Sequence, residues 1–269
     1  MRLINRVPER GLRVTLTVLP FLLVLVLYLS ASEARLALNP DDKLLPSLGQ
    51  MADTLKRYAL QEDPRTGGWL FWDDTLSSLR RLTLGIALAT AISLVLGIAM
   101  GAIPLVGATL STAAAVVSMI PPLAVLPVLF IVFGLDELSK VMLIVIGIAP
   151  VMTRDLEQRA REIPHEWLIK AQTLGASTWT LVLRVILPQL MPRLLVALRL
   201  ALGSAWLFLI AAEAIASTDG LGYRIFLVRR YLAMDVILPY VAWITLLAWL
   251  MDRALKAITV RLFPWHEGG

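Results

Sequence analysis

Six stretches of the chain are long and apolar enough to be membrane-spanning helices. A helix that crosses a hydrocarbon core of ~30 Å needs ~20 mostly apolar residues. The candidate spans are residues 12–29, 82–103, 110–133, 138–152, 194–216 and 236–250. The fourth and sixth are short, and both can extend through their flanks. The pattern predicts an all-α, polytopic membrane protein with six transmembrane helices in a single domain, residues 1–269.

The composition also favours a membrane protein. Hydrophobic residues make up 58% of the chain and charged residues 17%, whereas soluble domains average roughly 45–50% and about 25%. The chain has no cysteine and two histidines, which excludes thiolate catalysis, cysteine-ligated metals and a histidine-rich metal site. Its net charge of +5 is explained most simply by loop charges that set membrane orientation, so we expect no nucleic-acid partner.

Basic residues gather in three segments that fall on one side of the predicted membrane. They are the N-terminal tail with four arginines, the C-terminal tail, and the segment between the fourth and fifth spans. The loop of residues 30–74, with eight acids and five bases, falls on the other side. The positive-inside rule therefore predicts that both termini are cytoplasmic, although the last outer loop breaks the trend with three arginines.

The outer loop of residues 30–74 contains one pattern that predicts structure. Leu48, Met51, Leu55 and Tyr58 recur at helical spacing. This spacing indicates a short amphipathic helix that lies on the outer membrane surface or on the bundle. The alternative is a packed loop.

The third predicted span is interrupted by prolines. Pro121-Pro122 and Pro127 break its hydrogen-bond ladder in the middle of the membrane. Such a break is tolerated where neighbouring helices satisfy the freed carbonyls, or where the helix lines a cavity. The kink therefore serves helix packing alone or lines a translocation path, for which Pro121 and Pro122 are candidates.

The segment of residues 152–192 is too polar to span a membrane and too long for a tight turn. Pro164 can occupy the first turn of a new helix, Gly175 can end it in the left-handed conformation, and Ser177 can cap the next helix. The result is a helix of about ten residues between two breaks.

This short helix has one apolar stripe, formed by Trp167, Leu168, Ala171 and Leu174. An isolated helix of this length is marginal in water, so it needs something to dock against. A short amphipathic helix on the cytoplasmic face is what the groove of a partner protein accepts.

Several catalytic motifs are absent from the sequence. There is no G-x-x-x-x-G-K-[ST] loop, no H-E-x-x-H and no G-x-S-x-G, so we expect no catalytic residue and no metal site. Glu213 is the one clear intramembrane carboxylate, with Arg199 roughly 21 Å earlier along the same helix. Glu213 either belongs to the substrate path or its outer gate, or it reaches water or caps a neighbouring helix. For Arg199 the alternatives are a functional role and structural packing or a buried ion pair.

The spacing of Ala171, Gly175, Leu187 and Pro188 carries a resemblance. It resembles the signature of the permease subunits of bacterial ABC importers, which reads Glu-Ala-Ala, three residues, Gly, nine residues, Ile-x-Leu-Pro. The opening Glu-Ala is replaced here by Ile169-Lys170, which puts in doubt any ionic contact that the usual glutamate makes.

Further strings extend the resemblance over most of residues 74–255. They include residues 173–179, 198–200, 211–214 and 220–223 and the Ser77-x-x-Arg80 start of the second span. These strings look like the nitrate/sulfonate/taurine/bicarbonate branch of the family. Within that branch, residues 38–46, 133–140 and 229–235 look closest to permeases associated with urea carboxylase, for which the solute is urea or guanidine.

The resemblance implies a type I importer permease in the bacterial inner membrane, surrounded by lipid. The importer would hold two permease copies as a homodimer, two cytoplasmic ATPase subunits and an external substrate-binding protein, periplasmic or lipid-anchored. The chain would not be an enzyme and would hold no cofactor, because ATP binds to the partner. The coupling helix would be residues 164–177, and its ATPase-docking residues Trp167, Leu168, Ala171, Leu174, Gly175, Ala176 and Ser177. The alternatives are a self-sufficient secondary carrier and an intramembrane enzyme.

Overall fold

The computed structural model describes residues 9–40, 42–64 and 67–265, and within them every regular element is a helix. Outside the described residues lie two of the four N-terminal arginines, Arg2 and Arg6, one of the two histidines, His266, and two of the charged residues counted in the outer loop, Asp41 and Arg65. The helices are α1 (Arg10–Leu38), α2 (Leu48–Leu60), α3 (Leu70–Ala102), α4 (Pro104–Val117), α5 (Pro122–Phe133), α6 (Glu137–Arg161), α7 (His165–Thr173), α8 (Thr178–Leu181), α9 (Leu187–Ala216), α10 (Leu221–Arg229) and α11 (Met234–Leu262). A π-helical turn, Val182–Ile186, joins α8 to α9.

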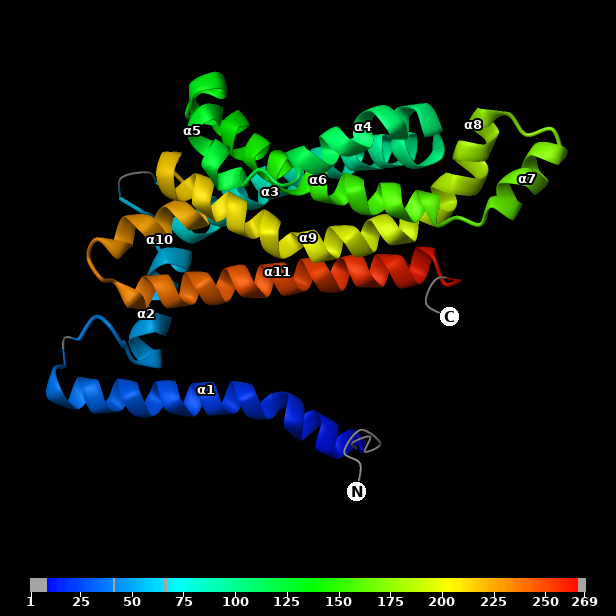
Figure 1. The fold of residues 1–269 in the computed structure, drawn as a ribbon. Coiled ribbons are helices and arrows are strands. Elements are labelled where there is room, and N and C mark those ends of the chain that lie inside the picture. Colours follow the sequence, from blue (N-terminus) through cyan, green and yellow to red (C-terminus); the bar gives the residue numbers. More distant parts are fainter. Residues whose placement is uncertain (1–8, 41, 65–66, 266–269) are drawn as a thin grey trace.

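The centre of the bundle is α6, which packs between α3 and α9 (Figure 1). Its apolar residues Leu143, Ile144 and Leu156 are fully buried. A glycine on α3 allows this close packing, since a Cβ on Gly97 would lie 2.6 Å from the Cβ of Leu156. The bundle therefore depends on backbone-to-backbone approach as well as on large apolar side chains.

The helices confirm an all-α membrane protein but not the count of six spans. Among the described residues, α1, α3, the continuous Thr178–Ala216 and α11 are each long and apolar enough to cross a membrane, and the bent pair α4–α5 makes up to five. The predicted span 138–152 lies in α6, where Lys140, Arg154 and Asp155 flank the apolar middle and make the helix too polar to count.

The break predicted in the third span is confirmed, and it is sharper than a kink. Helix α4 ends at Val117 and α5 begins at Pro122, and the two axes are bent by 96°. Pro121 supplies no N–H to continue α4, and it biases Ile120 away from helical backbone. Residues 110–133 are therefore two short helices that meet at a corner.

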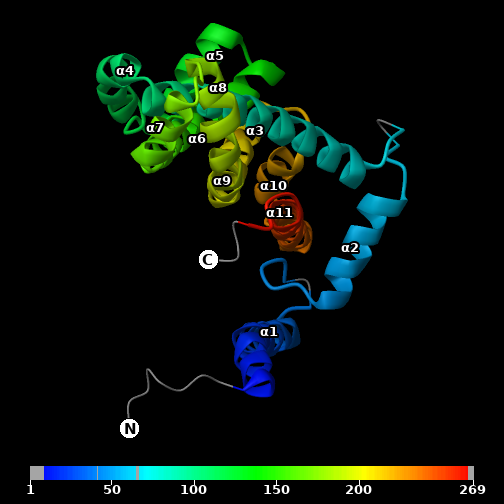
Figure 2. The same ribbon diagram turned by 90° about the vertical axis from the view of Figure 1, so that its right-hand side faces the viewer.

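Helix α1 lies apart from the bundle (Figures 1 and 2). None of the residues in its apolar window is buried. It contacts the loop that follows it: the Tyr28 hydroxyl donates to the Pro46 carbonyl at 2.6 Å, and Arg35 forms an ion pair with Asp42. A helix that is apolar on all sides and uncovered by protein is suited to a lipid environment.

The amphipathic helix predicted in the outer loop is confirmed as α2, and it rests on the bundle. Ser47 and Gln50 form a capping box at its start. Thr54 donates to Asp235 at the first turn of α11, at 2.8 Å, and the Tyr58 ring meets the Tyr240 ring edge-on at 6.4 Å. The loop of residues 30–74 is thus fixed to the bundle by α2.

Candidate functional site

Helix α7 and its two boundaries lie at one end of the bundle (Figure 1). Gly175 has φ +82°, the Gly175 N–H donates to the Gln172 carbonyl at 2.9 Å, and the Ala176 N–H donates to the Ala171 carbonyl at 3.0 Å. These two bonds form a Schellman C-cap, which requires a left-handed residue at this place. Ser177 then accepts from the Thr180 N–H at 3.2 Å and caps α8. The predicted end of the short helix and the predicted cap of the next are both confirmed.

The two faces of α7 have different neighbours. Leu168 packs against the small cluster formed by Ile98, Ala160, Ile186 and Leu190. Ala171 and Ala176 are half-buried. Trp167 is 46% exposed and Leu174 88% exposed, and Gly175 and Ser177 are also exposed. The predicted stripe is therefore divided: Leu168 and Ala171 lie nearer the bundle, Leu174 faces outward, and Trp167 is partly exposed beside a pocket that Leu190 and Arg193 of α9 also line.

One exposed aromatic residue next to α7 was not among the predicted docking residues. Trp179, in α8, is 73% exposed. It lies two residues after the Ser177 cap, and its position just past the glycine turn is the sequence signal that could have identified it. Trp167, Leu174 and Trp179 form what we call the outward apolar set.

Helix α7 is connected to the core by a continuous rod. From Thr178 the chain runs through α8, the π turn and α9 to Ala216. The π register is seen where the Leu187 N–H donates to the Val182 carbonyl. Pro188 follows at once and has no N–H of its own, so the ladder can change register here at little cost.

The opposite end of the bundle holds a buried charge cluster centred on Arg81 of α3, which is 2% exposed. Its guanidinium donates to both carboxylate oxygens of Glu137 at 2.6 and 2.7 Å. It also donates to Glu213 at 2.8 Å, and to the side chain and carbonyl of Asp219 at 2.5 and 3.0 Å. Arg81 thus links α3, α6, α9 and the loop before α10 through five charge-assisted bonds.

Glu213 is fully buried and is the anchor of α10. It accepts from the Ser78 hydroxyl at 2.8 Å and from the Gly222 N–H at 2.8 Å. The preceding Leu221 N–H donates to Ser78 at 2.8 Å, so the first turn of α10 is satisfied by side chains of α3 and α9. Of the alternatives set out above, capping of a neighbouring helix is what this geometry shows.

The glycine before α10 is required by the same contacts. Gly220 has φ +110°, and a Cβ on it would lie 2.5 Å from Glu213 Oε1 and 2.8 Å from Arg81 Nη1. Any side chain here would displace Glu213 or Arg81. This explains in physical terms the Gly220-Leu-Gly-Tyr223 string of the sequence.

A second buried group lies beside the first. Asp74 is 1% exposed and accepts from Arg224 at 2.7 and 3.2 Å, from the Tyr240 hydroxyl at 3.2 Å and from the Gly220 N–H at 3.0 Å. It joins α3 to α10 and α11. Arg199, by contrast, forms a half-exposed ion pair with Asp252 of α11 at 2.8 and 3.1 Å, so it pairs between helices.

One carboxylate of the cluster lies outside the helices, in the loop between α9 and α10. Partial burial alone would raise the pKa of Asp219, but hydrogen bonds from Arg81 and Ser77 more than offset it and hold the pKa below its ordinary value. Asp219 is therefore ionised at neutral pH, when it pairs with Arg81.

The structure does not bring the three predicted path residues together. Pro121 is exposed and Pro122 half-buried at the corner of α4 and α5. Glu213 is instead enclosed by α3 and α10. Sequence reasoning also missed Arg81 and Glu137. The available signal was a second arginine directly after Arg80, within the helix that carries the second apolar span.

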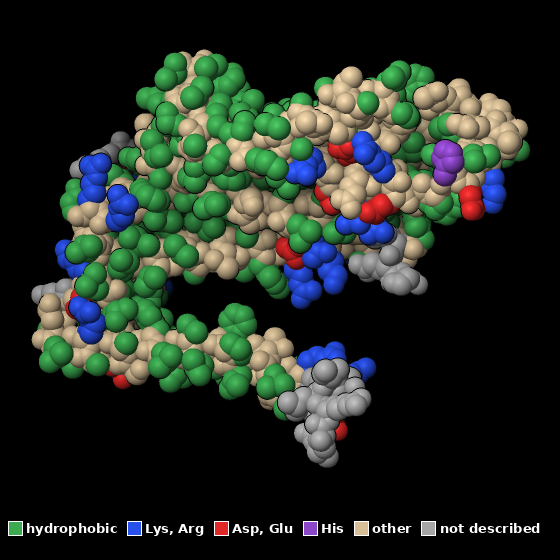
Figure 3. All heavy atoms as spheres, viewed as in Figure 1, with side chains coloured by type: hydrophobic (Ala, Val, Ile, Leu, Met, Phe, Trp, Pro, Cys, Tyr) green, Lys and Arg blue, Asp and Glu red, His purple; other side chains and the backbone are tan. Residues whose placement is uncertain are grey.

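Hydrophobic and charged side chains occupy different parts of the protein surface. Hydrophobic side chains gather mostly on the half of the visible face away from α7 and along α1, whereas charged side chains lie at the far left edge and over the half toward α7 (Figure 3). A bundle of long apolar helices with an exposed short helix between two turns at one end defines a polytopic membrane protein with a surface suited to a partner. Among the described residues no group of histidine, cysteine or acidic side chains is arranged to hold a metal ion.

Comparison with known proteins identifies the family. The model described as "Binding-protein-dependent transport system inner membrane component" matches residues 89–265. The chain is 37% identical to the taurine transport system permease protein TauC of Escherichia coli over 72% of its length and 71% of that protein. It is 27% identical to the bicarbonate transport system permease protein CmpB of Synechocystis, covering 78% of this chain and 75% of that one.

The fold agrees. An inward-facing structure of the MetNI methionine ABC transporter aligns with a TM-score of 0.63 at 20% identity, covering 71% of this chain and 95% of that one. The protein belongs to the binding-protein-dependent transport system inner membrane component family. It is a permease subunit of an ABC importer, in the nitrate/sulfonate/taurine/bicarbonate branch, and its ATPase is a separate subunit.

Proposed function

We propose that this permease imports a small solute with a sulfonate or similar anionic group. The support is the names of its relatives, which transport taurine and bicarbonate. Urea or guanidine, suggested by residues 38–46, 133–140 and 229–235, is the second candidate. Two permease copies, two ATPase subunits and an external substrate-binding protein would make up the importer.

The observation that carries the coupling mechanism is the division of α7 into two faces. Leu168 packs on the bundle, whereas the outward apolar set of Trp167, Leu174 and Trp179 is 46%, 88% and 73% exposed, respectively. Exposed tryptophans are enriched among the anchors of protein interfaces, and an amphipathic helix places its apolar side chains in a partner's groove. We therefore place the ATPase on the outward apolar set, with Gly175, Ala176 and Ser177 forming the turn between its members.

Movement of the ATPase would reach the bundle through the inner face of α7. Leu168 contacts the cluster that contains Ile186 and Leu190, and these belong to the rod that continues into α9. A displacement of α7 would thus shift the start of α9. The far end of α9 carries Glu213, which is tied to Arg81 and α10.

This assignment fixes an orientation. The α7 end would be cytoplasmic, with both chain termini on the same side, and the Arg81 cluster would face outward. Helix α6 has 25 residues, roughly 37 Å at 1.5 Å per residue, so we propose that it crosses the membrane inside the bundle despite its charged flanks.

The second copy and the solute path fall on the same side of the bundle in this proposal. Leu200 and Leu207 of α9 and Ile131 of α5 are exposed apolar residues. They would be covered by the partner copy or by lipid. The corner at Pro121 and Pro122 would border the path between the two copies, and Glu213 would hold its outer end.

The test is reconstitution. The chain is co-purified from mildly solubilised membranes, and recovered proteins are identified by mass spectrometry. The complex is then placed in liposomes with labelled taurine, bicarbonate, urea or guanidine. ATP-dependent uptake that needs the ATPase and the binding protein supports the proposal. Solute exchange by the chain alone would favour the secondary-carrier alternative.

A further inference from the structure

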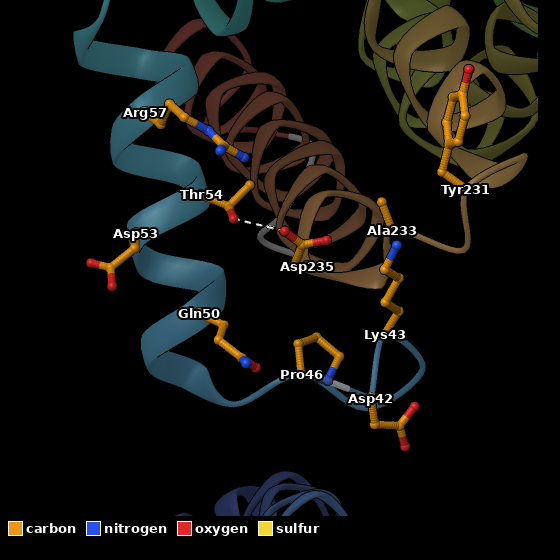
Figure 4. A pocket seen from close by; sticks show the side chains of 10 residues that line it. All are labelled: Asp42, Lys43, Pro46, Gln50, Asp53, Thr54, Arg57, Tyr231, Ala233 and Asp235. Carbon is orange, nitrogen blue, oxygen red and sulfur yellow. Dashed lines mark hydrogen bonds between the residues drawn. The ribbon is translucent and has the colours of Figure 1, made fainter. Parts of the chain in front are cut away.

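A polar cavity of about 730 Å³ lies at the α10 end of the molecule, separate from the buried charge cluster. Its walls come from the loop before α2, from one face of α2, and from the turn between α10 and α11 (Figure 4). Small-molecule sites are usually concave spaces of roughly 300–1,000 Å³ formed by separate elements. We call this space the α2 cavity.

The α2 cavity is built from sequence strings that the transport machinery has not yet explained. Two of the strings singled out above, residues 38–46 and 229–235, both reach it, although they are far apart in the chain. The family model begins at residue 89, so the wall formed by residues 42–57 lies outside the matched region. The cavity therefore lies between the matched region, which supplies Tyr231, Ala233 and Asp235, and the part of the chain that precedes it.

Two cations in this wall lack an acidic partner. In the part of the chain that the structure describes, Lys43 has no hydrogen bond or ion pair, and Arg57 only stacks over the Tyr58 ring at 5.6 Å. In Figure 4 Lys43 extends from the loop toward Ala233, and the Arg57 guanidinium extends from α2 toward α11. Both bring positive charge to the cavity.

The acidic side chains around the cavity are not equivalent. Asp42 is neutralised by Arg35, and Asp53 points away from the space (Figure 4). Asp235 lines the cavity, and the Thr54 hydroxyl occupies one of its oxygens at 2.8 Å. The other oxygen is free to accept. The cavity thus presents two unpaired cations and one available carboxylate.

The backbone on the third side is held in an unusual conformation. Leu232 has φ +55° and is the only non-glycine with positive φ among the described residues. A leucine there is strained, and such strain gathers where a loop is held for a purpose. It places Tyr231 and Ala233 on the cavity rim.

We infer that the α2 cavity binds a small zwitterion. Its sulfonate or carboxylate would lie between Lys43 and Arg57, and its ammonium would bond to Asp235. Such ionic hydrogen bonds are stronger than neutral ones, and a ligand with both charges satisfies all three residues at once. The choice of an aminosulfonate as the first ligand rests on the proposed function.

The test is equilibrium binding of labelled taurine to the full-length permease in lipid nanodiscs, without ATPase or binding protein. We expect saturable binding that ethanesulfonate, which lacks the ammonium, displaces about tenfold less well. The Lys43→Gln, Arg57→Gln double variant should lose at least about tenfold in affinity. Asp235→Asn should abolish the preference for taurine over ethanesulfonate.

Lys56→Gln is the matched control, because Lys56 is an exposed lysine of α2 that does not line the cavity. Its affinity should equal that of the unmodified protein. No saturable taurine binding, or equal binding by the double variant, would overturn the inference. ATP-dependent uptake in liposomes is scored separately, so an importer without this site and a protein that is not an importer give different results.

Discussion

Gly175 offers the sharpest test of the α7 assignment, because the structure separates two reasons for a glycine there. Its φ is +82°, and a Cβ would meet no atom of this chain within 4 Å. An alanine would therefore cost only the backbone strain, about 1–2 kcal/mol. A partner protein seated against the turn would add a steric cost that rises with side-chain size.

Backbone strain and steric contact predict different orders of ATPase binding among variants at Gly175. Asparagine tolerates the left-handed region better than alanine does, although it is larger. If backbone conformation dominates, as the open space around Gly175 indicates, Gly175→Asn retains more ATPase binding than Gly175→Ala. A strain of 1–2 kcal/mol corresponds to a decrease of roughly 5- to 30-fold in the equilibrium population of chains in which the C-cap of α7 is formed.

The measurement is recovery of the ATPase in detergent pull-downs, followed by ATP-dependent uptake. Gly11→Ala is the control, because Gly11 also has open space but lies in a helix; it should behave as the unmodified protein does. If the asparagine variant is worse than alanine, the backbone reasoning is refuted and a close approach of the ATPase takes its place. Normal binding and uptake by Gly175→Trp would refute docking at this turn altogether.

Three further predictions concern the bundle. Arg81→Gln leaves the buried carboxylate of Glu213 without its ionic partner and should lower the free energy of unfolding by about 3–5 kcal/mol, seen as a lower Tm in detergent, whereas exposed Arg80→Gln should change it little. The lowered pKa of Asp219 means that its contribution to stability is present above the ordinary aspartate pKa and is lost as pH falls through the folded-state pKa. Asp219→Asn should therefore flatten the fall in Tm below about pH 4. An unchanged profile of Tm against pH would count against the Arg81 contact. Leu174→Asp should weaken ATPase recovery with Tm unchanged, while Leu168→Asp should lower Tm as well because it faces the bundle; identical behaviour of the two would contradict the division of α7.

The boundaries of α7 could be predicted from the sequence because they depend on local chemistry. Gly175 ends the helix through its own backbone conformation, and Ser177 caps the next helix through a neighbour three residues away. The apolar stretches likewise reveal most of the long helices, since each is a property of consecutive residues. The span predicted in α6 is not confirmed, because the charged residues at its flanks make the helix less apolar than the other long helices.

The division of α7 could not be predicted in the same way. The stripe of Leu168 and Leu174 is correct as a pattern, but which part faces the bundle depends on Ile186 and Leu190. The Arg81 cluster could not be predicted either, because it too depends on contacts between residues that are distant in the sequence. Its partners lie far along the chain, so only the packing of four segments reveals that one arginine serves them all.

The spacing of those partners has a consequence for how the protein is made. Arg81 precedes Glu137 by 56 residues and Glu213 by 132. At synthesis rates of about 5–20 residues per second, Glu137 is made several seconds after Arg81, and Glu213 is made later still. During that interval the charge of Arg81 must stay hydrated at the membrane boundary, and the cluster closes only once α9 has been inserted. A chain that stops before Glu213 therefore has Arg81 paired with Glu137 alone, and the contacts that join α3 and α6 to α9 and to the start of α10 form only after the last turn of α9 has been made.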